Sequence, residues 1–192
     1  MRYIDEIKNF KCFNEQESKD KELMLNLYNK FGDELLNRSC NVAHFSASAI
    51  ILNKKHDKVL FGYHNIYKNY GWLGGHADGM DDLLMVAKKE VNEESGLSEL
   101  KLLNDKAISL EILPVGYHYK HNEFVSSHLH LNLTYIFEAD ENSKIRIKPD
   151  ENSDLVWIPI IDIKKIVKEE IIIPIYYKIL QKAGFIKEKN EI

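Results

Sequence analysis

Three glutamates, Glu90, Glu93 and Glu94, stand close together in a chain of 192 residues. In an α-helix, positions i, i+3 and i+4 lie on one side, so the three carboxylates would project in one direction. Each like-charged pair at this spacing costs roughly 0.2–0.5 kcal/mol, and a hard cation such as Mg²⁺ removes that cost by accepting the oxygens. The pattern therefore indicates either a metal site or an acidic helix face in water.

The surrounding sequence favours the metal site. A helix is expected from about Asp81 to Ser95, with Asp81 or Asp82 as its N-cap and Gly96 as its end signal. Its apolar residues fall on an adjoining side and should dock it onto a sheet; they are Leu83, Leu84, Ala87 and Val91. The glutamates would then lie at the edge of the core, beside a glycine-bearing loop at 70–80 whose backbone can approach a ligand closely.

These residues form a recognisable motif. Gly75, Asp81 and the run from Lys89 to Leu97 resemble the Nudix box, GX5EX7REUXEEXGU, in which U is a bulky apolar residue, and the match spans 23 residues. Asp81 stands where the motif has a glutamate, and Lys89 stands where it has an arginine. Both departures keep the charge, although lysine lacks the planar two-pronged hydrogen bonding of arginine. The resemblance implies an α/β/α sandwich with a mixed sheet and hydrolysis of a phosphoanhydride bond.

The resemblance also implies roles for the box residues. Glu90 and Glu94 would bind the metal directly, Glu93 would bind it directly or through water, and the Gly75 carbonyl could complete the ligand set. The cation would be Mg²⁺ or Mn²⁺. Asp81 and Lys89 would support these ligands.

Nudix enzymes often take one more acidic residue from a loop just before the last strand of the sheet. Glu151 occupies such a place, six residues ahead of Trp157. Other acidic residues in or near this region are Asp150, Asp154 and Glu123. The implied mechanism is in-line attack of water on phosphorus, with Glu94 as a catalytic ligand and either Glu90 or Glu151 as the base.

A half-buried strand is expected at 124–138, because leucines and aromatic residues alternate there with polar side chains. His128, His130 and Asn132 share the polar side and are expected to line the substrate cleft together with His76. Metal binding by His128 and His130 is the alternative, although histidine pairs on such strands more often form a polar wall.

Composition limits the partners. The 26 basic and 30 acidic residues give a net charge of -4 and form no long block of one sign, which argues against genomic nucleic acid. Cys12 and Cys40 are expected to be free thiols. The N-terminus has no signal-like apolar run, and no stretch approaches about 18 apolar residues, so we expect a cytoplasmic protein without a membrane partner.

The expected organisation is a helical extension at 1–40 followed by a single-core, Nudix-like catalytic domain at 41–192. The extension would hold one amphipathic helix at 14–37, either a homodimer contact or a lid. Further elements are expected as strands at 43–53, 58–65 and 101–119 and as helices at 161–169 and 174–183.

Two other functions are compatible with the same motif. A Nudix-fold module that binds or senses a nucleotide without turnover would have little reason to keep three repelling glutamates. A diphosphate isomerase commonly needs a cysteine near the cleft, and Cys40, just before the first strand, is poorly placed. The substrate is expected to be a small nucleotide-like molecule, such as a nucleoside diphosphate derivative.

Overall fold

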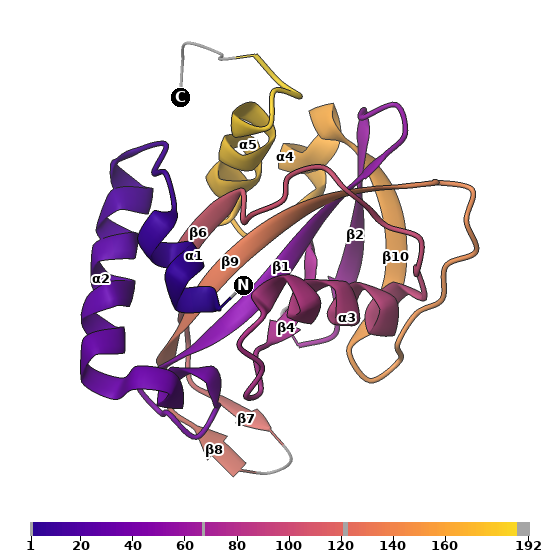
Figure 1. The fold of residues 1–192 in the computed structure, drawn as a ribbon. Coiled ribbons are helices and arrows are strands. Elements are labelled where there is room, and N and C mark those ends of the chain that lie inside the picture. The colour runs from indigo at the N-terminus through magenta and orange to yellow at the C-terminus, as the bar shows by residue number, and fades with distance from the viewer. Residues whose placement is uncertain (1, 67, 121–122, 188–192) are drawn as a thin grey trace.

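A computed structural model describes residues 2–66, 68–120 and 123–187 (Figure 1). Its centre is a mixed sheet in which β1 (Ala43–Asn53) runs parallel to β9 (His128–Ala139). The sheet order is β10-β2-β1-β9-β5; β3 also pairs with β2, β4 with β1 and β6 with β9. The flanking strands are β2 (Lys58–His64), β3 (Asn69–Gly71), β4 (Leu73–His76), β5 (Lys101–Leu102), β6 (Ser109–Val115) and β10 (Asn152–Pro159).

The strand β1 organises the sheet because it has partners along both edges. All 11 of its residues pair with β9 on one side. On the other side, Leu52 pairs with Val59 of β2, and the stretch from Ser46 to Ala49 pairs with β4. The predicted strands at 43–53 and 58–65 are therefore confirmed within one residue, and β1 is buried along its whole length, as expected for a central strand.

Helices cover both faces of the sheet, as the mixed α/β architecture predicts (Figure 1). On one face, α3 (Leu83–Ser95) packs with the N-terminal helices over a core that includes Phe45, Leu131 and Leu133. On the other face, α4 (Ile163–Ile166) and α5 (Ile173–Lys182) pack over a second core that includes Ile50 and Ile136. Alternate residues of β1 and β9 supply the two cores, because successive strand side chains point to opposite faces.

The N-terminal segment contains more than the single helix predicted at 14–37. It forms α1 (Tyr3–Asn9), α2 (Glu15–Phe31) and a 3-10 helix, η1 (Gly32–Leu36). The Asn14 side chain caps α2 by accepting a hydrogen bond from the Glu17 amide, and Gly32 ends α2 with a φ of 57°. The short α1 was missed because one or two turns carry little periodic signal.

Buried charges join α2 to the rest of the molecule. Glu17 of α2 is fully buried, and Nζ of Lys178 in α5 lies 3.2 Å from Oε1 of Glu17 and 2.9 Å from Oε1 of Glu111 in β6. Lys182 also reaches Oε2 of Glu17, at 2.9 Å. The described part of the extension is therefore packed against α5 and β6, and the predicted boundary at residue 40 stays a prediction.

Two predicted strands are broken in the structure. The segment 101–119 contains β5, β6 and the start of β7 (His118–Lys120), with a loop between β5 and β6 in which the Asn104 side chain bonds the Lys106 carbonyl. The segment 124–138 is divided into β8 (Glu123–Val125) and β9, and β8 pairs with β7 in a separate two-stranded sheet. The predicted helix at 161–169 is shorter than expected, because Val167 is extended.

Across the described part of the chain, no helix combines the length and apolar character needed to cross a membrane.

Candidate active site

The helix α3 holds the glutamates in a defined orientation. Asp82 is its N-cap and accepts a hydrogen bond of 3.2 Å from the Met85 amide, while Gly96 ends it at a φ of 75°. The predicted docking face is confirmed: Leu83, Ala87 and Val91 are fully buried, Leu84 is partly buried against the same core, and Val86 joins them. The docked face places Glu90 and Glu94 against β4.

Close contacts with neighbouring elements explain the two glycines of β4. The Gly74 amide donates a hydrogen bond of 2.8 Å to Oε1 of Glu94. A Cβ at Gly75 would fall 2.5 Å from Cδ of Glu90, so only glycine leaves room for this carboxylate. Gly75 therefore allows the backbone of β4 to approach Glu90 closely, whereas Gly74 is required by β1, because a Cβ there would clash with the Ala47 carbonyl oxygen and with Ser48.

Glu151 completes a three-carboxylate cluster. It directly precedes β10, and one carboxylate oxygen from each of Glu90, Glu94 and Glu151 lies within 4.8 Å of the others. The structure thus brings together the residues that the sequence placed 57 positions apart, from Glu94 to Glu151. The other acidic candidates for this position are not in the cluster. Asp154 accepts a hydrogen bond from the Tyr70 hydroxyl at 2.7 Å, and Asp150 and Glu123 are exposed.

Two lysines bridge the acidic groups. Nζ of Lys89 lies 3.2 Å from Oε1 of Glu90 and 3.2 Å from Oε1 of Glu93, and its supporting role stays a prediction. Lys148 was not identified from the sequence; it lies 3.3 Å from Oε2 of Glu93 and 2.9 Å from Oε1 of Glu151. A lysine in a polar loop carries no local signal for this contact.

Asn152 was also missed. It is buried at the start of β10, and its side-chain nitrogen donates to the Glu94 carbonyl at 3.1 Å, while its Oδ1 accepts from the Lys148 amide at 3.2 Å. This side chain ties the Glu151 loop to the end of α3.

Asp81 lies apart from the carboxylate cluster. Its carbonyl accepts a hydrogen bond from the Tyr3 amide at 2.9 Å, and its carboxylate lies 3.6 Å from Nε of Arg2. Since Asp82 is the N-cap, the contacts of Asp81 are with the N-terminal segment.

The electrostatics of the cluster follow from burial. Burial raises the pKa of Glu94 to about 8, against the opposing effect of the Gly74 amide hydrogen bond. Burial also raises the pKa of Glu90, opposed by Lys89, whereas the hydrogen bond from Lys89 lowers the pKa of the more exposed Glu93. Crowded, partly buried carboxylate oxygens are a donor set that fits a hard divalent cation, because the cation compensates both burial and repulsion.

His128, His130 and Asn132 lie on the face of β9 opposite Leu131 and Leu133, and His76 of β4 shares that face through its pairing with Ser46. Gly75 faces Glu90 on the other side of the sheet, so the structure does not bring these polar residues into one cleft with the carboxylates, contrary to the expectation from the sequence. His128 and His130 are half-buried, and Nε2 of His130 lies 3.3 Å from Nε2 of His128 and 3.2 Å from Nε2 of His76. Burial, with repulsion from neighbouring histidines, lowers the pKa of His130 to about 2. The alternation predicted for this strand is confirmed.

Asn132 lies deeper than expected. It is 1% exposed, and its Oδ1 accepts hydrogen bonds from the hydroxyls of Ser46 and Ser48 at 3.0 and 2.9 Å. It belongs to a buried polar layer beside Glu111, and its role in substrate binding stays a prediction.

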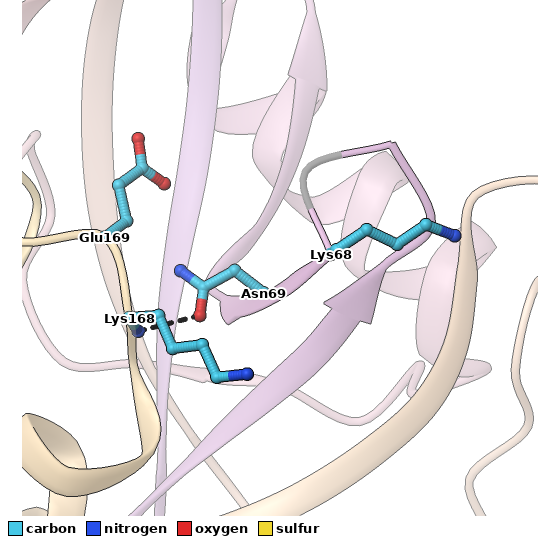
Figure 2. Close-up of a pocket in the computed structure, with 4 residues that line it drawn as sticks. All are labelled: Lys68, Asn69, Lys168 and Glu169. Carbon is cyan, nitrogen blue, oxygen red and sulfur yellow. Dashed lines mark hydrogen bonds between the residues drawn. The ribbon is translucent and has the colours of Figure 1, made fainter.

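A separate hollow of about 260 Å³ is lined by Lys68, Asn69, Lys168 and Glu169 (Figure 2). Figure 2 shows the Lys168 amide bonded to Oδ1 of Asn69, at 2.8 Å, with the Lys68 side chain pointing away from them. None of these lining residues is one of the clustered carboxylates, so the hollow does not coincide with the acidic site.

Comparison with protein families agrees with the motif identified in the sequence. The model of the NUDIX domain matches residues 42–180. This match covers most of the chain and includes the whole motif from Gly75 to Leu97, so the chain belongs to the Nudix family. Family membership supports a pyrophosphohydrolase type of activity, and Nudix hydrolases generally use divalent metals such as Mg²⁺.

Solved structures share the fold at low sequence identity. A C. elegans Ap4A hydrolase in a binary complex is 14% identical with a TM-score of 0.56, covering 74% of this chain and 98% of that one. A Nudix hydrolase from M. smegmatis is 13% identical with a TM-score of 0.56, covering 77% and 90%. The E. coli dihydroneopterin triphosphate pyrophosphohydrolase is 14% identical with a TM-score of 0.53, covering 71% and 92%. No curated protein matches the chain.

Proposed function

We propose that this protein is a divalent-metal-dependent pyrophosphohydrolase that cleaves a phosphoanhydride bond in a nucleoside diphosphate derivative or a similar small molecule. The observation that carries the proposal is the cluster of Glu90, Glu94 and Glu151, whose carboxylate oxygens lie within 4.8 Å of one another. Carboxylate oxygens are the ligands preferred by Mg²⁺ and Mn²⁺.

In this proposal, Glu90 and Glu94 are metal ligands, with Glu93 and the Gly75 carbonyl at the edge of the site. The Gly74 amide fixes one oxygen of Glu94, and Lys89 holds Glu90 and Glu93 in place. When bound, the metal ion neutralises the diphosphate and lowers the pKa of the attacking water.

Two carboxylates are placed to accept the proton of that water. Glu90 is buried and has a raised pKa, which suits a base that works near neutral pH. Glu151 has the more exposed side chain, and Lys148 orients it through the contact at 2.9 Å. Single substitutions distinguish them, because loss of the base lowers kcat even when the metal is saturating, whereas loss of a ligand is partly restored by excess metal.

Substrate contact by His76, His128 and His130 stays a prediction. These side chains lie on the sheet face opposite Glu90, so they do not border the carboxylate cluster directly. Their neighbours His44 and Asn132 are more deeply buried.

The test is a substrate screen with phosphate and pyrophosphate readouts, using nucleoside diphosphate derivatives together with Ap4A and dihydroneopterin triphosphate. The last two are included because two proteins of similar fold carry these names. Turnover should appear with added Mg²⁺ or Mn²⁺ and vanish in chelator. Turnover that persists in chelator, or binding of a nucleotide without any hydrolysis, would contradict the proposal.

A further inference from the structure

A second group of potential metal ligands lies on the other face of the sheet from the carboxylate cluster. His44 of β1, His76 of β4 and His130 of β9 each offer a ring nitrogen, and these three nitrogens lie within 4.8 Å of one another. The sheet register brings them together: His44 is the direct partner of His130, and Ser46, two residues further along the same face, is the partner of His76.

The ring nitrogens of His76 and His130 are as close as two ligands of one tetrahedral ion. Nε2 of His76 lies 3.2 Å from Nε2 of His130. A tetrahedral zinc ion with Zn–N bonds of 2.0–2.1 Å requires ligand nitrogens about 3.3 Å apart. Two imidazoles facing each other through Nε2 can otherwise share only one N–H, so the contact suits a shared cation.

The orphaned nitrogen of His44 is an independent sign of a missing ligand. His44 is 4% exposed, and its Nε2 is buried with no hydrogen-bond partner among the residues that the structure describes. Its Nδ1 lies 3.4 Å from the Cys40 carbonyl oxygen, which can accept a hydrogen bond from Nδ1–H. In that tautomer Nε2 carries the lone pair that a metal ion would need. Metal-binding histidines commonly donate their other N–H to a backbone carbonyl in this way.

His128 borders the group without belonging to it. Its Nδ1 faces the Ser126 carbonyl at 2.8 Å, and its Nε2 is 3.3 Å from Nε2 of His130, yet it is not one of the three mutually close ligands. Three histidines with a fourth position left open is the arrangement of a zinc site that binds water or an exogenous ligand. His76 and His130 are only half-buried, which leaves a route for an ion.

We propose that His44, His76 and His130 bind a borderline divalent transition-metal ion, with Zn²⁺ as the best-fitting ion, at a site separate from the carboxylate cluster. Imidazole nitrogens suit Zn²⁺ and Co²⁺, whereas Mg²⁺ prefers oxygen ligands. The alternation of strand β4 separates the two sites, because Gly75 faces Glu90 and the next residue, His76, faces the other way. The proposal does not depend on hydrolysis.

The test is metal binding by the full chain after removal of metals with a chelator. Zn²⁺ is titrated calorimetrically in the presence of excess Mg²⁺, which occupies oxygen ligands, and Co²⁺ is titrated to detect the visible spectrum of a tetrahedral nitrogen site. We expect one equivalent of Zn²⁺ to bind to the wild type and equally to a Glu90→Gln/Glu94→Gln variant. This second result separates the histidine site from the carboxylate site.

His76→Ala and His130→Asn should each weaken Zn²⁺ binding by about 100-fold or more, since loss of even a residue that orients a ligand costs 10–100-fold. The control is His56→Asn, because His56 lies in the turn at the far end of β1 and its ring contacts Glu138. His56 has a φ of 56°, a left-handed conformation that asparagine also adopts readily. Metal-free melting temperatures verify that each variant is folded. Zinc binding that is lost in the glutamate variant, or that is unchanged in both histidine variants, would overturn the proposal.

Discussion

The amide of Gly74 donates a hydrogen bond of 2.8 Å to Oε1 of Glu94, so a strand backbone directly fixes one carboxylate of the acidic cluster. The neighbouring glycine makes room for Glu90. The helix α3 and the glycine-bearing strand β4 therefore act as one unit, and substitutions in either should alter the same site.

Replacing Glu90 or Glu94 with glutamine should separate activity from stability. Glutamine keeps the size and helix preference of glutamate, while an uncharged amide is a poorer metal ligand. Hydrolysis should fall by roughly 10²-fold or more, and the metal requirement should rise. The melting temperature should not fall, because glutamine removes a crowded carboxylate at position 90 and, at position 94, replaces a carboxyl group that burial already keeps protonated near neutral pH. The control is Glu170→Gln on the exposed surface, which should leave turnover unchanged. Normal hydrolysis by both variants at limiting metal would show that the glutamates are only a solvated helix face.

Gly75→Ala should impair the site through space alone. The added Cβ would lie 2.5 Å from Cδ of Glu90, so this carboxylate must move away from its place beside Glu94 and Glu151. We expect activity at a fixed, limiting Mg²⁺ concentration to fall by roughly tenfold or more, since misplacement by about 1 Å can cost up to 10²-fold. Gly116→Ala is the matched control, because a Cβ there meets nothing within 4 Å. Equal activity of the two alanine variants would refute this reading of the glycine.

Lys148→Met should strengthen Mg²⁺ binding. Lys148 contacts Glu93 and Glu151 and places a positive charge beside the proposed cation. Removing one unit charge about 4 Å from a divalent ion changes its energy by roughly 2 kcal/mol even in a water-like dielectric, which corresponds to a change in affinity of roughly 30-fold before salt screening. The measurement is the Mg²⁺ concentration for half-maximal binding by calorimetry. Lys144→Met, an exposed position in the same loop, is the control. Weaker Mg²⁺ binding by Lys148→Met would mean that the lysine positions a ligand more than it repels the ion.

The metal-free protein should lose stability as the pH rises toward 8. Burial raises the pKa of Glu94 to about 8 in the folded state from its ordinary value of 4.5, so between these values the folded state holds a proton that the unfolded chain has released. Because the unfolded state then binds fewer protons, the free energy of unfolding falls with rising pH, by roughly 1 kcal/mol per pH unit. Denaturant unfolding in chelator between pH 6 and about 8 measures this slope. Glu94→Gln should flatten it, and identical slopes for the two proteins would contradict the assigned pKa.

Lys178→Met should destabilise the whole protein. Lys178 lies between Glu17 and Glu111, both of which are almost completely buried, and its removal leaves these carboxylates short of a partner. Breaking a buried ion pair by removing one partner costs about 3–5 kcal/mol. The free energy of unfolding from denaturant titration gives the loss, and Lys165→Met, which removes an exposed pair with Asp162, should cost at most about 1 kcal/mol. A small effect of Lys178→Met would show that Lys182 alone can satisfy Glu17.

Much of the helix that carries the site could be predicted from the sequence alone. The spacing of Glu90, Glu93 and Glu94, the apolar face of α3 and its end at Gly96 are all local, because a helix relates residues three and four apart. The β1 strand and the alternation in β9 were predicted for the same reason. Short elements such as α1, and the breaks between β5 and β6 and between β8 and β9, depend on tertiary packing and were missed.

The sequence by itself determined the family motif, the acidic helix and the class of metal that its carboxylates suit. Only the tertiary structure decided which distant residues join that helix. Glu151 was one of several acidic candidates until the loop before β10 placed it beside Glu94, and Lys148 and Asn152 had no signal at all. His44 meets His130 only because β1 and β9 pair in parallel at one register. Pairing between strands that are far apart in the chain depends on the whole core, which no local pattern of residues encodes.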